Sequence, residues 1–166
     1  MMSNQCSLDV FEATTKPETP LATVVNITRV KGKRRVKYDV YIGRKTRIHG
    51  DSIFRNQFRI GKDGTRSEVI EKYRQWIMGE AFIDNEQIRR AAILILIPEM
   101  KGLILGCWCK PEPCHGDILC DLINGDIEIP FIESEYVEQA FDYYYSVSGT
   151  CGMAILPFLP RMGDGA

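Results

Sequence analysis

One stretch of this sequence constrains the fold more than any other, because it changes within a short distance from a strand pattern to a helix pattern. Residues 103–107 form a run that is apolar on both faces, which is typical of a buried central strand in a parallel sheet. After a turn rich in cysteine and proline, apolar residues recur at helical spacing: Ile118, Leu119, Leu122 and Ile123. A strand that leads directly into a helix is the unit from which parallel α/β sheets are built.

Two further strands are expected earlier in the chain. Residues 23–28 are short and β-branched, which favours a strand. Between residues 36 and 42 apolar and polar residues alternate, and this period of two predicts a strand with one face in the core. We interpret the basic stretch 31–35 between them as a solvated turn.

Three more helices are expected. Thr65 and Glu68 have the spacing of a capping box, and Gly79 is a suitable stop for the helix that follows. A second helix is predicted over 85–97, although its last part could instead be a buried strand. A last helix over 134–144 completes the pattern. The order of elements predicts an α/β fold, with a small Rossmann-like sheet and helices packed on it.

The same reading divides the chain into four parts. We expect a flexible N-terminal arm at 1–20, an α/β domain at 21–125, a C-terminal helical extension at 126–147 and a mobile tail at 148–166.

Charge and composition exclude some classes of protein. The 21 Lys and Arg residues balance 22 Asp and Glu, so broad electrostatic binding to nucleic acid is not expected, although the sequence leaves nucleic acid open as a partner. No apolar run approaches the roughly 18 residues of a membrane span, so no membrane partner is expected. Six cysteines without a secretory signal predict a cytoplasmic protein with reduced thiols. The oligomeric state is left open.

The turn at 107–117 is the candidate functional centre, and one hypothesis is that it binds an anion. Pro113 suits the first position of a helix, where the next backbone N–H groups would point outward and attract a phosphate or carboxylate. Gly116 would allow close approach of a ligand. Asp117 in the first turn can itself satisfy the helix dipole, so plain capping is the alternative.

A second hypothesis is a metal centre. The turn supplies the sulfur and nitrogen ligands that zinc prefers: Cys107, Cys109, Cys114 and His115. Residues one apart on a strand face opposite ways, and adjacent helix residues diverge by about 100°, so four ligands from this segment would be strained. A further ligand could come from one of the remaining cysteines: Cys6, Cys120 or Cys151.

A third hypothesis is catalysis by these side chains. Cys114 lies where a helix N-terminus lowers a thiol pKa, His115 could act as a general acid or base, and Asp117 could orient the histidine or act alone. The alternative is that the cysteines are small buried residues and that His115 is a hydrogen-bonded turn residue.

Polar residues elsewhere could complete a binding site. Arg44 follows the strand at 36–42, so it reaches the same sheet edge as Cys107 if the strands are parallel, and it could clamp a phosphate. Trp108 could stack on a base or sugar, or pack in the core. His49 is alone in its loop and we interpret it as incidental. Further candidate ligand-binding residues lie in and after the same loop: Asn56, Lys62, Asp63 and Arg66.

Several blocks together resemble a known family. They are residues 38–44, 56–58, 60–66, 73–76 and 105–119. On these blocks the chain resembles the domain of unknown function 4326 family, found in bacteria and their phages, over roughly residues 23–124. The most specific block reads Cys-Trp-Cys, then Pro-Cys-His-Gly-Asp.

The resemblance implies a small Rossmann-like α/β domain and specifies no activity. The last block also resembles the domain of unknown function 488 family, which implies a nucleotide or nucleic-acid role. Family members usually read Trp-Gly-Asn-Pro-Phe where residues 54–58 read Phe-Arg-Asn-Gln-Phe, so a turn that could position a substrate differs here.

Two main functions follow. The first is an enzyme, of hydrolase or transferase type, acting on a nucleotide, nucleoside or other phosphorylated small molecule. Arg44 and the helix start would hold phosphate, Asn56 would fix the ligand, and Asp117 or His115 would move protons. The second is a zinc-stabilised, non-catalytic binding module, such as a phage or bacterial accessory protein. Thiol redox chemistry is a third idea, but Cys107 and Cys109 lack the usual spacing of two intervening residues.

Overall fold

The structure is a computed structural model that describes residues 20–30, 33–34 and 36–151. The expected arm at 1–20 therefore lies outside the described residues except for its last residue, and the expected tail lies outside them from residue 152 onward.

A small parallel sheet forms the base of the domain. Its strands are β1 (Thr23–Asn26), β4 (Val40–Tyr41) and β5 (Ile104–Cys107), in the order β1-β5-β4 with both pairings parallel. The strand predicted at 103–107 is confirmed as the central one. Because the carboxyl ends of parallel strands meet at one edge, the residues that follow β4 and β5 come together there.

The strand predicted at 36–42 is confirmed only near its end, since β4 covers two residues and Val36 is exposed. The predicted alternation is wrong at Tyr41, which is buried like its neighbours on either side. The reason is that the loop after β4 folds back, so that the ring of His49 stacks on that of Tyr41 at a centroid distance of 4.4 Å.

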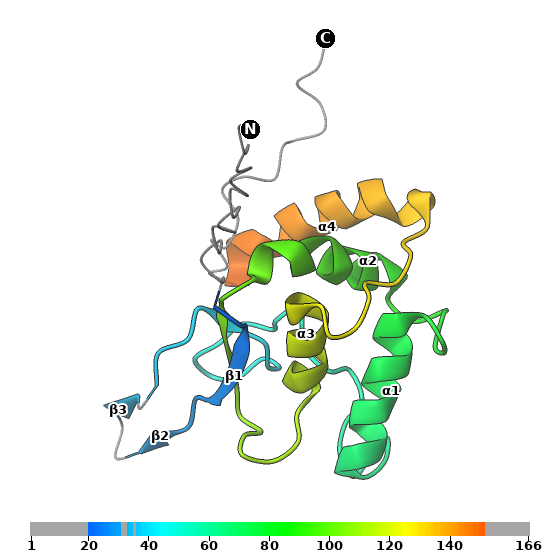
Figure 1. Cartoon of the computed structure of the whole chain (residues 1–166). Helices are drawn as coiled ribbons and strands as arrows, with labels where there is room; N and C mark the ends of the chain where they lie inside the picture. Colours follow the sequence, from blue (N-terminus) through cyan, green and yellow to red (C-terminus); the bar gives the residue numbers. More distant parts are fainter. Residues whose placement is uncertain (1–19, 31–32, 35, 152–166) are drawn as a thin grey trace, which may run out of the picture.

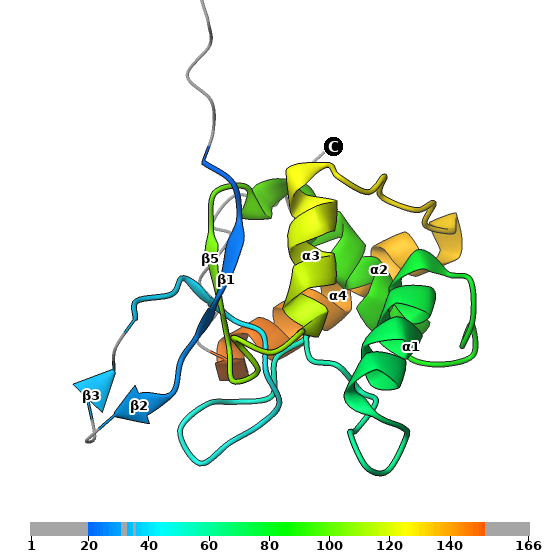
Figure 2. The ribbon, with the colours of Figure 1, turned by 60° about the horizontal axis from the view of Figure 1, so that its bottom comes forward.

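The basic stretch lies in a separate two-stranded ribbon. Strands β2 (Arg29–Val30) and β3 (Lys33–Arg34) pair in antiparallel fashion and project away from the helices (Figures 1 and 2). The residues between them, where the turn was expected, lie outside the described residues.

Helix α1 (Arg66–Met78) begins and ends where the sequence predicts. Thr65 is the N-cap, and it forms a reciprocal capping box with Glu68. Gly79 ends the helix in the left-handed conformation (φ 76°) that glycine adopts without steric cost.

The segment predicted as a helix over 85–97 is helical, so the strand alternative is wrong. Helix α2 (Gln87–Leu96) passes into a single 3₁₀ turn, η1 (Ile97–Met100), at Pro98. Helix α4 (Ser134–Cys151) packs along α2 and continues past the boundary expected at 147 (Figure 1).

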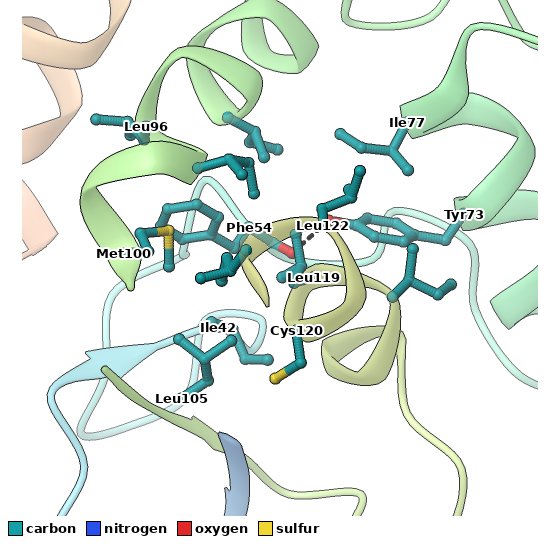
Figure 3. Packing of buried hydrophobic residues seen from close by; sticks show 14 of the residues in the cluster. Ile42, Phe54, Tyr73, Ile77, Leu96, Met100, Leu105, Leu119, Cys120 and Leu122 are labelled. Atoms are coloured by element: carbon teal, nitrogen blue, oxygen red, sulfur yellow. Dashed lines mark hydrogen bonds between the residues drawn. The ribbon is translucent and has the colours of Figure 1, made fainter. Parts of the chain in front are cut away.

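The core lies between the sheet and the helices. Figure 3 shows Ile42 and Leu105 from the sheet facing Leu119 and Leu122 of α3 (His115–Asn124), with Phe54 from the long loop between them. The loop carbonyl of Phe54 accepts a hydrogen bond from the buried Tyr73 hydroxyl at 3.1 Å. These contacts make one mixed α/β domain with a three-stranded parallel sheet and four helices in the described residues.

No helix within residues 20–151, as far as these are described, has both the length and the apolar character needed to cross a membrane.

Candidate functional site

The Cys-rich turn connects the end of β5 to the start of α3. The helix begins at His115 with Cys114 as its N-cap, so the prediction that Pro113 is the first helical residue is wrong by two positions. Cys114 has extended backbone angles (φ −138°, ψ 147°) and its own N–H is outside the helix. The side chain of Cys114 is therefore directed by the turn and not by helix geometry.

The free N–H groups at this helix start are used within the protein. The Cys114 N–H donates to Asp117 Oδ2 at 2.9 Å, and the Gly116 N–H donates to Cys114 Sγ at 3.3 Å. Asp117 also pairs with Lys110 Nζ at 2.5 Å. The structure thus favours plain capping at this position over outward N–H groups that wait for an anion.

Three thiols and an imidazole converge just inside the turn. The Sγ atoms of Cys107 and Cys109 are 3.6 Å apart, and Cys114 Sγ lies 3.7 Å from His115 Nδ1. The ligand atoms of Cys107, Cys114 and His115 all lie within 4.8 Å of one another. All three cysteines are free thiols, and Cys109 adjoins a group of three candidate ligands that do meet: Cys107, Cys114 and His115.

Two features of the backbone bring these side chains closer together than their spacing in the sequence predicts. Strand β5 ends at Cys107, so Cys109 is already in the turn and its sulfur can curl back toward that of Cys107. Cys114 is outside the helix, so the divergence of about 100° between adjacent helical residues does not apply to Cys114 and His115.

His115 presents one defined nitrogen to the thiols. Its Nε2 lies 3.0 Å from the carbonyl oxygen of Ile42, which can only accept, so Nε2 carries the proton. Burial lowers the pKa of His115, which keeps the ring neutral. Nδ1 is then a free lone pair aimed at Cys114 Sγ, the arrangement that a metal-binding histidine requires.

The three thiols shift one another's pKa values in opposite directions. Contacts with the Cys107 and Cys114 thiols lower the pKa of Cys109 to about 2. The contact with Cys109 raises the pKa of Cys107 to about 11, and the contacts with both other cysteines raise the pKa of Cys114. A cation would be needed to hold all three as thiolates.

Asn26 was missed by the sequence reasoning, although it fixes the turn. It is the last residue of β1, opposite Cys107, and its side-chain Nδ2 donates to the carbonyl of Lys110 and to that of Trp108 at 3.3 Å. Its place near the end of the strand predicted at 23–28 was the available signal, because parallel strands finish at one edge.

A cavity of about 280 Å³ adjoins the cluster. Most of the predicted site residues line it: Arg44, Asn56, Arg66, Trp108, Cys107, Cys109, Cys114 and His115. Four predicted residues are not among those that line it: Lys62, Asp63, Gly116 and Asp117. Lys45, Thr46 and Ile60 do line it and were not singled out from the sequence.

Gly116 allows α3 to pack closely against the sheet, and it does not line the cavity where a ligand could approach. A Cβ on Gly116 would lie 2.6 Å from Ile42 Cδ1 and 2.9 Å from Val24 Cγ2. Only glycine lets α3 approach the sheet this closely, and that contact brings His115 to the end of β4.

Arg44 and Asn56 are held by the loop around them. Arg44 Nε donates to the Asn56 carbonyl at 2.8 Å, and its Nη2 donates to the Phe58 carbonyl at 2.5 Å. The Asn56 side chain donates to the Val69 carbonyl and accepts the Phe58 N–H, each within 2.9 Å. Asn56 therefore shapes the wall of the cavity with its side chain already bonded.

Trp108 and His49 belong to one aromatic group over the sheet edge. Trp108 is 37% exposed and its Nε1 donates to the Tyr41 hydroxyl at 3.0 Å. His49 stacks on the other side of the Tyr41 ring, so it is a structural residue and not an incidental one.

Comparison with known proteins gives the family. A family model described as Domain of unknown function (DUF4326) matches residues 25–125, which is more than half of the chain. The chain belongs to this family. No solved structure matches it.

Two viral relatives illustrate the similarity. An "Uncharacterized 12.4 kDa protein in nrdA-td intergenic region" of Enterobacteria phage T4 is 33% identical over 107 residues, which cover 64% of this chain and 86% of the relative. "Uncharacterized protein R718" of Acanthamoeba polyphaga mimivirus is 32% identical over 111 residues, which cover 60% of this chain and 77% of the relative.

The DUF4326 match contains the whole site. The cavity and the thiol cluster lie between Gly43 and His115, inside the matched region, whereas α4 lies beyond it. The changed turn at 54–58 keeps Phe54, Asn56 and Phe58 buried, because Asn56 supplies hydrogen bonds that hold the turn without the family's Gly and Pro.

Proposed function

We propose that this DUF4326 protein is a zinc-binding domain in which four side chains hold one zinc ion at the sheet edge: Cys107, Cys109, Cys114 and His115. The convergence of Cys107, Cys114 and His115, with Cys109 next to Cys107, carries the proposal, because thiolates and imidazoles are the ligands that zinc prefers.

Two of the distances in the cluster fit zinc. With Zn–S bonds of about 2.3 Å and a Zn–N bond of about 2.05 Å, a tetrahedral ion places two sulfurs ~3.8 Å apart and a sulfur and nitrogen ~3.5 Å apart. The corresponding separations here are 3.6 Å for Cys107 to Cys109 and 3.7 Å for Cys114 to His115. The ligand atoms of Cys107, Cys114 and His115 lie within 4.8 Å of one another, so these three could close around one ion, and the Cys109 side chain would turn toward them to complete the site.

The groups around the ligands also suit a metal centre. The Gly116 N–H donates to Cys114 Sγ, and the cationic Arg66 lines the same cavity as Cys109, so both favour thiolates. The Ile42 carbonyl fixes the tautomer of His115. Such bonds orient ligands and are an expected part of a zinc site.

These contacts support a binding domain better than a hydrolase or transferase. Four protein ligands complete a tetrahedral site and leave no position for a catalytic water. His115 would be bonded through both ring nitrogens, and Asp117 is paired with Lys110 outside the cavity. An enzyme acting on a nucleotide would need a proton-transfer group other than these.

The setting is consistent with the other expectations. Zinc binding needs reduced thiols, which the cytoplasmic location expected from the sequence would provide. The cavity at the carboxyl ends of β4 and β5 supports the expected Rossmann-like arrangement, whose ligands bind at such edges. Both relatives named above are viral, which fits the proposed role as an accessory domain.

Elemental analysis of protein purified without chelator tests the proposal. We expect about one zinc per chain, and a fall of roughly 10 °C in Tm on removal of the metal, equivalent to about 3–5 kcal/mol for a chain of this length. Cys109→Ser should lose most of the zinc, and Cys109 suits the test because it is only half-buried.

Cys120→Ser is the matched control. Cys120 is also a buried free thiol, but it lies within α3 and outside the cluster. The Cys120→Ser protein should therefore keep its zinc. Wild-type protein that contains no zinc and takes up none when it is added would disprove the proposal, as would equal zinc loss in the two variants.

A further inference from the structure

Three cationic side chains surround the cavity beside the proposed zinc centre: Arg44, Lys45 and Arg66. No Asp or Glu side chain of the described part of the chain lines this cavity. Among the residues that the structure describes, none of the three cations forms an ion pair with a carboxylate.

Three other arginines of the domain are paired with carboxylates. Arg89 is bonded to Glu86 at 2.6 Å, Arg74 to Glu80 at 2.5 Å and Arg55 to Glu86 at 2.8 Å. The three cations of the cavity have no such partner within the described residues, and like charges in one hollow favour the entry of an anion.

Arg44 is fixed in place for such an anion. Its Nε and Nη2 donate to the backbone carbonyls of Asn56 and Phe58. Neutral carbonyls hold the planar guanidinium without cancelling its charge, and they leave Nη1 for a ligand. A pre-oriented guanidinium loses little entropy when it binds a phosphate.

The proposed zinc centre changes the charge count only slightly. Zinc with three thiolates and a neutral imidazole would carry a net charge of −1, and Arg66, which lines the cavity together with Cys109, can offset it. Arg44 and Lys45 then remain for the ligand, which places the expected anion at the Arg44 side of the cavity.

The rest of the cavity is apolar and aromatic. Phe58 and Ile70 line it, and Ile60 and Trp108 leave 53% and 37% of their surfaces exposed. Exposed aromatic and aliphatic faces beside cations suit a flat ring attached to an anionic group. The volume of about 280 Å³ is near the lower limit, roughly 300 Å³, of small-molecule sites.

We infer that this cavity binds a small phosphorylated molecule that also carries an aromatic ring, of which a nucleoside 5′-monophosphate is the simplest example. Arg44 and Lys45 hold the phosphate, and Trp108 with Ile60 contacts the ring. The inference rests on the proposed function, because the zinc-bound turn forms one wall of the cavity.

Isothermal titration calorimetry on the zinc-loaded full chain tests it. The probes are the common nucleoside 5′-monophosphates, the matching nucleosides, ribose 5-phosphate and inorganic phosphate. We expect at least one monophosphate to bind, its nucleoside to bind about tenfold more weakly or worse, and the affinity to fall with added salt.

Variants of the cavity residues distinguish binding of the phosphate group from binding of the aromatic ring. Arg44→Gln and Lys45→Gln should each weaken the monophosphate about tenfold, whereas Arg47→Gln and Lys62→Gln, exposed cations outside the cavity, should not. Trp108→Leu should weaken the monophosphate and leave the affinity for ribose 5-phosphate unchanged.

The zinc content of each sample distinguishes the two proposals. Zinc-loaded protein that binds no monophosphate overturns this inference alone, and so does a nucleoside that binds as tightly as its monophosphate. An unchanged affinity in Arg44→Gln has the same meaning. Protein that holds no zinc yet binds a monophosphate through Arg44 overturns the zinc proposal and supports the cavity assignment.

Discussion

Helices α1 and α3 begin with the same motif built from different atoms. Each N-cap side chain accepts a backbone N–H of the first turn, and an acidic residue three positions later bonds back to the N-cap N–H. In α1 the pair is Thr65 and Glu68, which are exposed. In α3 it is Cys114 and Asp117, and Cys114 is 1% exposed.

The difference shows that capping alone does not explain Cys114. A hydroxyl or carboxylate oxygen is a good N-cap acceptor, whereas sulfur is a weak one. The fold uses an oxygen cap at α1, where a cap is all that is needed, and a sulfur cap at α3, where the same atom lies 3.7 Å from His115 Nδ1. The sulfur is thus better explained as a ligand that also caps.

Among changes at the two helix starts, Cys114→Ser should have the largest effect on zinc binding. Serine is a good N-cap, so the helix start should be kept, but the affinity for zinc should fall by more than about 100-fold, or roughly 3 kcal/mol. Competition with a chromophoric chelator would measure it. Thr65→Ser is the matched change at α1 and should leave zinc affinity and stability almost unchanged. If Cys114→Ser kept its zinc, the sulfur would be no more than a cap.

Gly116→Ala tests the closer packing of α3. Gly116 is the second helical residue, and the added Cβ would meet Ile42 and Val24 at under 3.0 Å, so we expect a loss of about 1–3 kcal/mol in urea unfolding. Ser67 holds the same position in α1 and is exposed, so Ser67→Ala should change stability by less than about 0.5 kcal/mol. Equal effects would mean that the two helix starts are packed alike.

Thr65→Ala measures the value of a cap without a metal. Removal of an N-cap oxygen typically costs about 1 kcal/mol, which urea unfolding can detect. The zinc content should not change, because Thr65 is outside the cluster. A loss of zinc in this variant would show that α1 and the centre are coupled, contrary to the separation proposed here.

The smallest predicted effect is the loss of stability when Glu68 in the α1 capping box is protonated at low pH. The Thr65 N–H holds the pKa of Glu68 below its ordinary value of 4.5. A lowered pKa in the folded state means that Glu68 contributes stability above the ordinary value, and that this contribution is lost as the pH falls through the lowered one. An NMR titration of the Glu68 carboxyl carbon should give a midpoint below 4.5, and a midpoint above it would contradict the capping box.

Local patterns predicted the elements better than the sequence predicted their long-range contacts. The capping box at Thr65 and the apolar run at 103–107 each depend on residues close in the chain, and both are confirmed. The alternation at 36–42 was misleading because Tyr41 is covered by His49, and nothing local indicates that contact.

The residues of the candidate site were likewise predicted better than the long-range contacts that hold them. The parallel pairing of β4 with β5 brings Arg44 to the edge that carries Cys107, as the sequence suggested. Three of the four proposed ligands meet in the structure, although the end of β5 and the extended backbone of Cys114, which bring them together, could not be located from spacing. Asn26 was missed because its bond to the turn spans 84 residues.

That last contact bears on the order of folding. The four proposed ligands lie within nine consecutive residues, 107–115, so a short chain segment can bring them together at little loop-closure cost. The bond from Asn26 closes a far longer loop and requires β1 to have docked beside β5. An ion captured by the nascent turn would therefore provide a preformed strand end against which the N-terminal strand later adds.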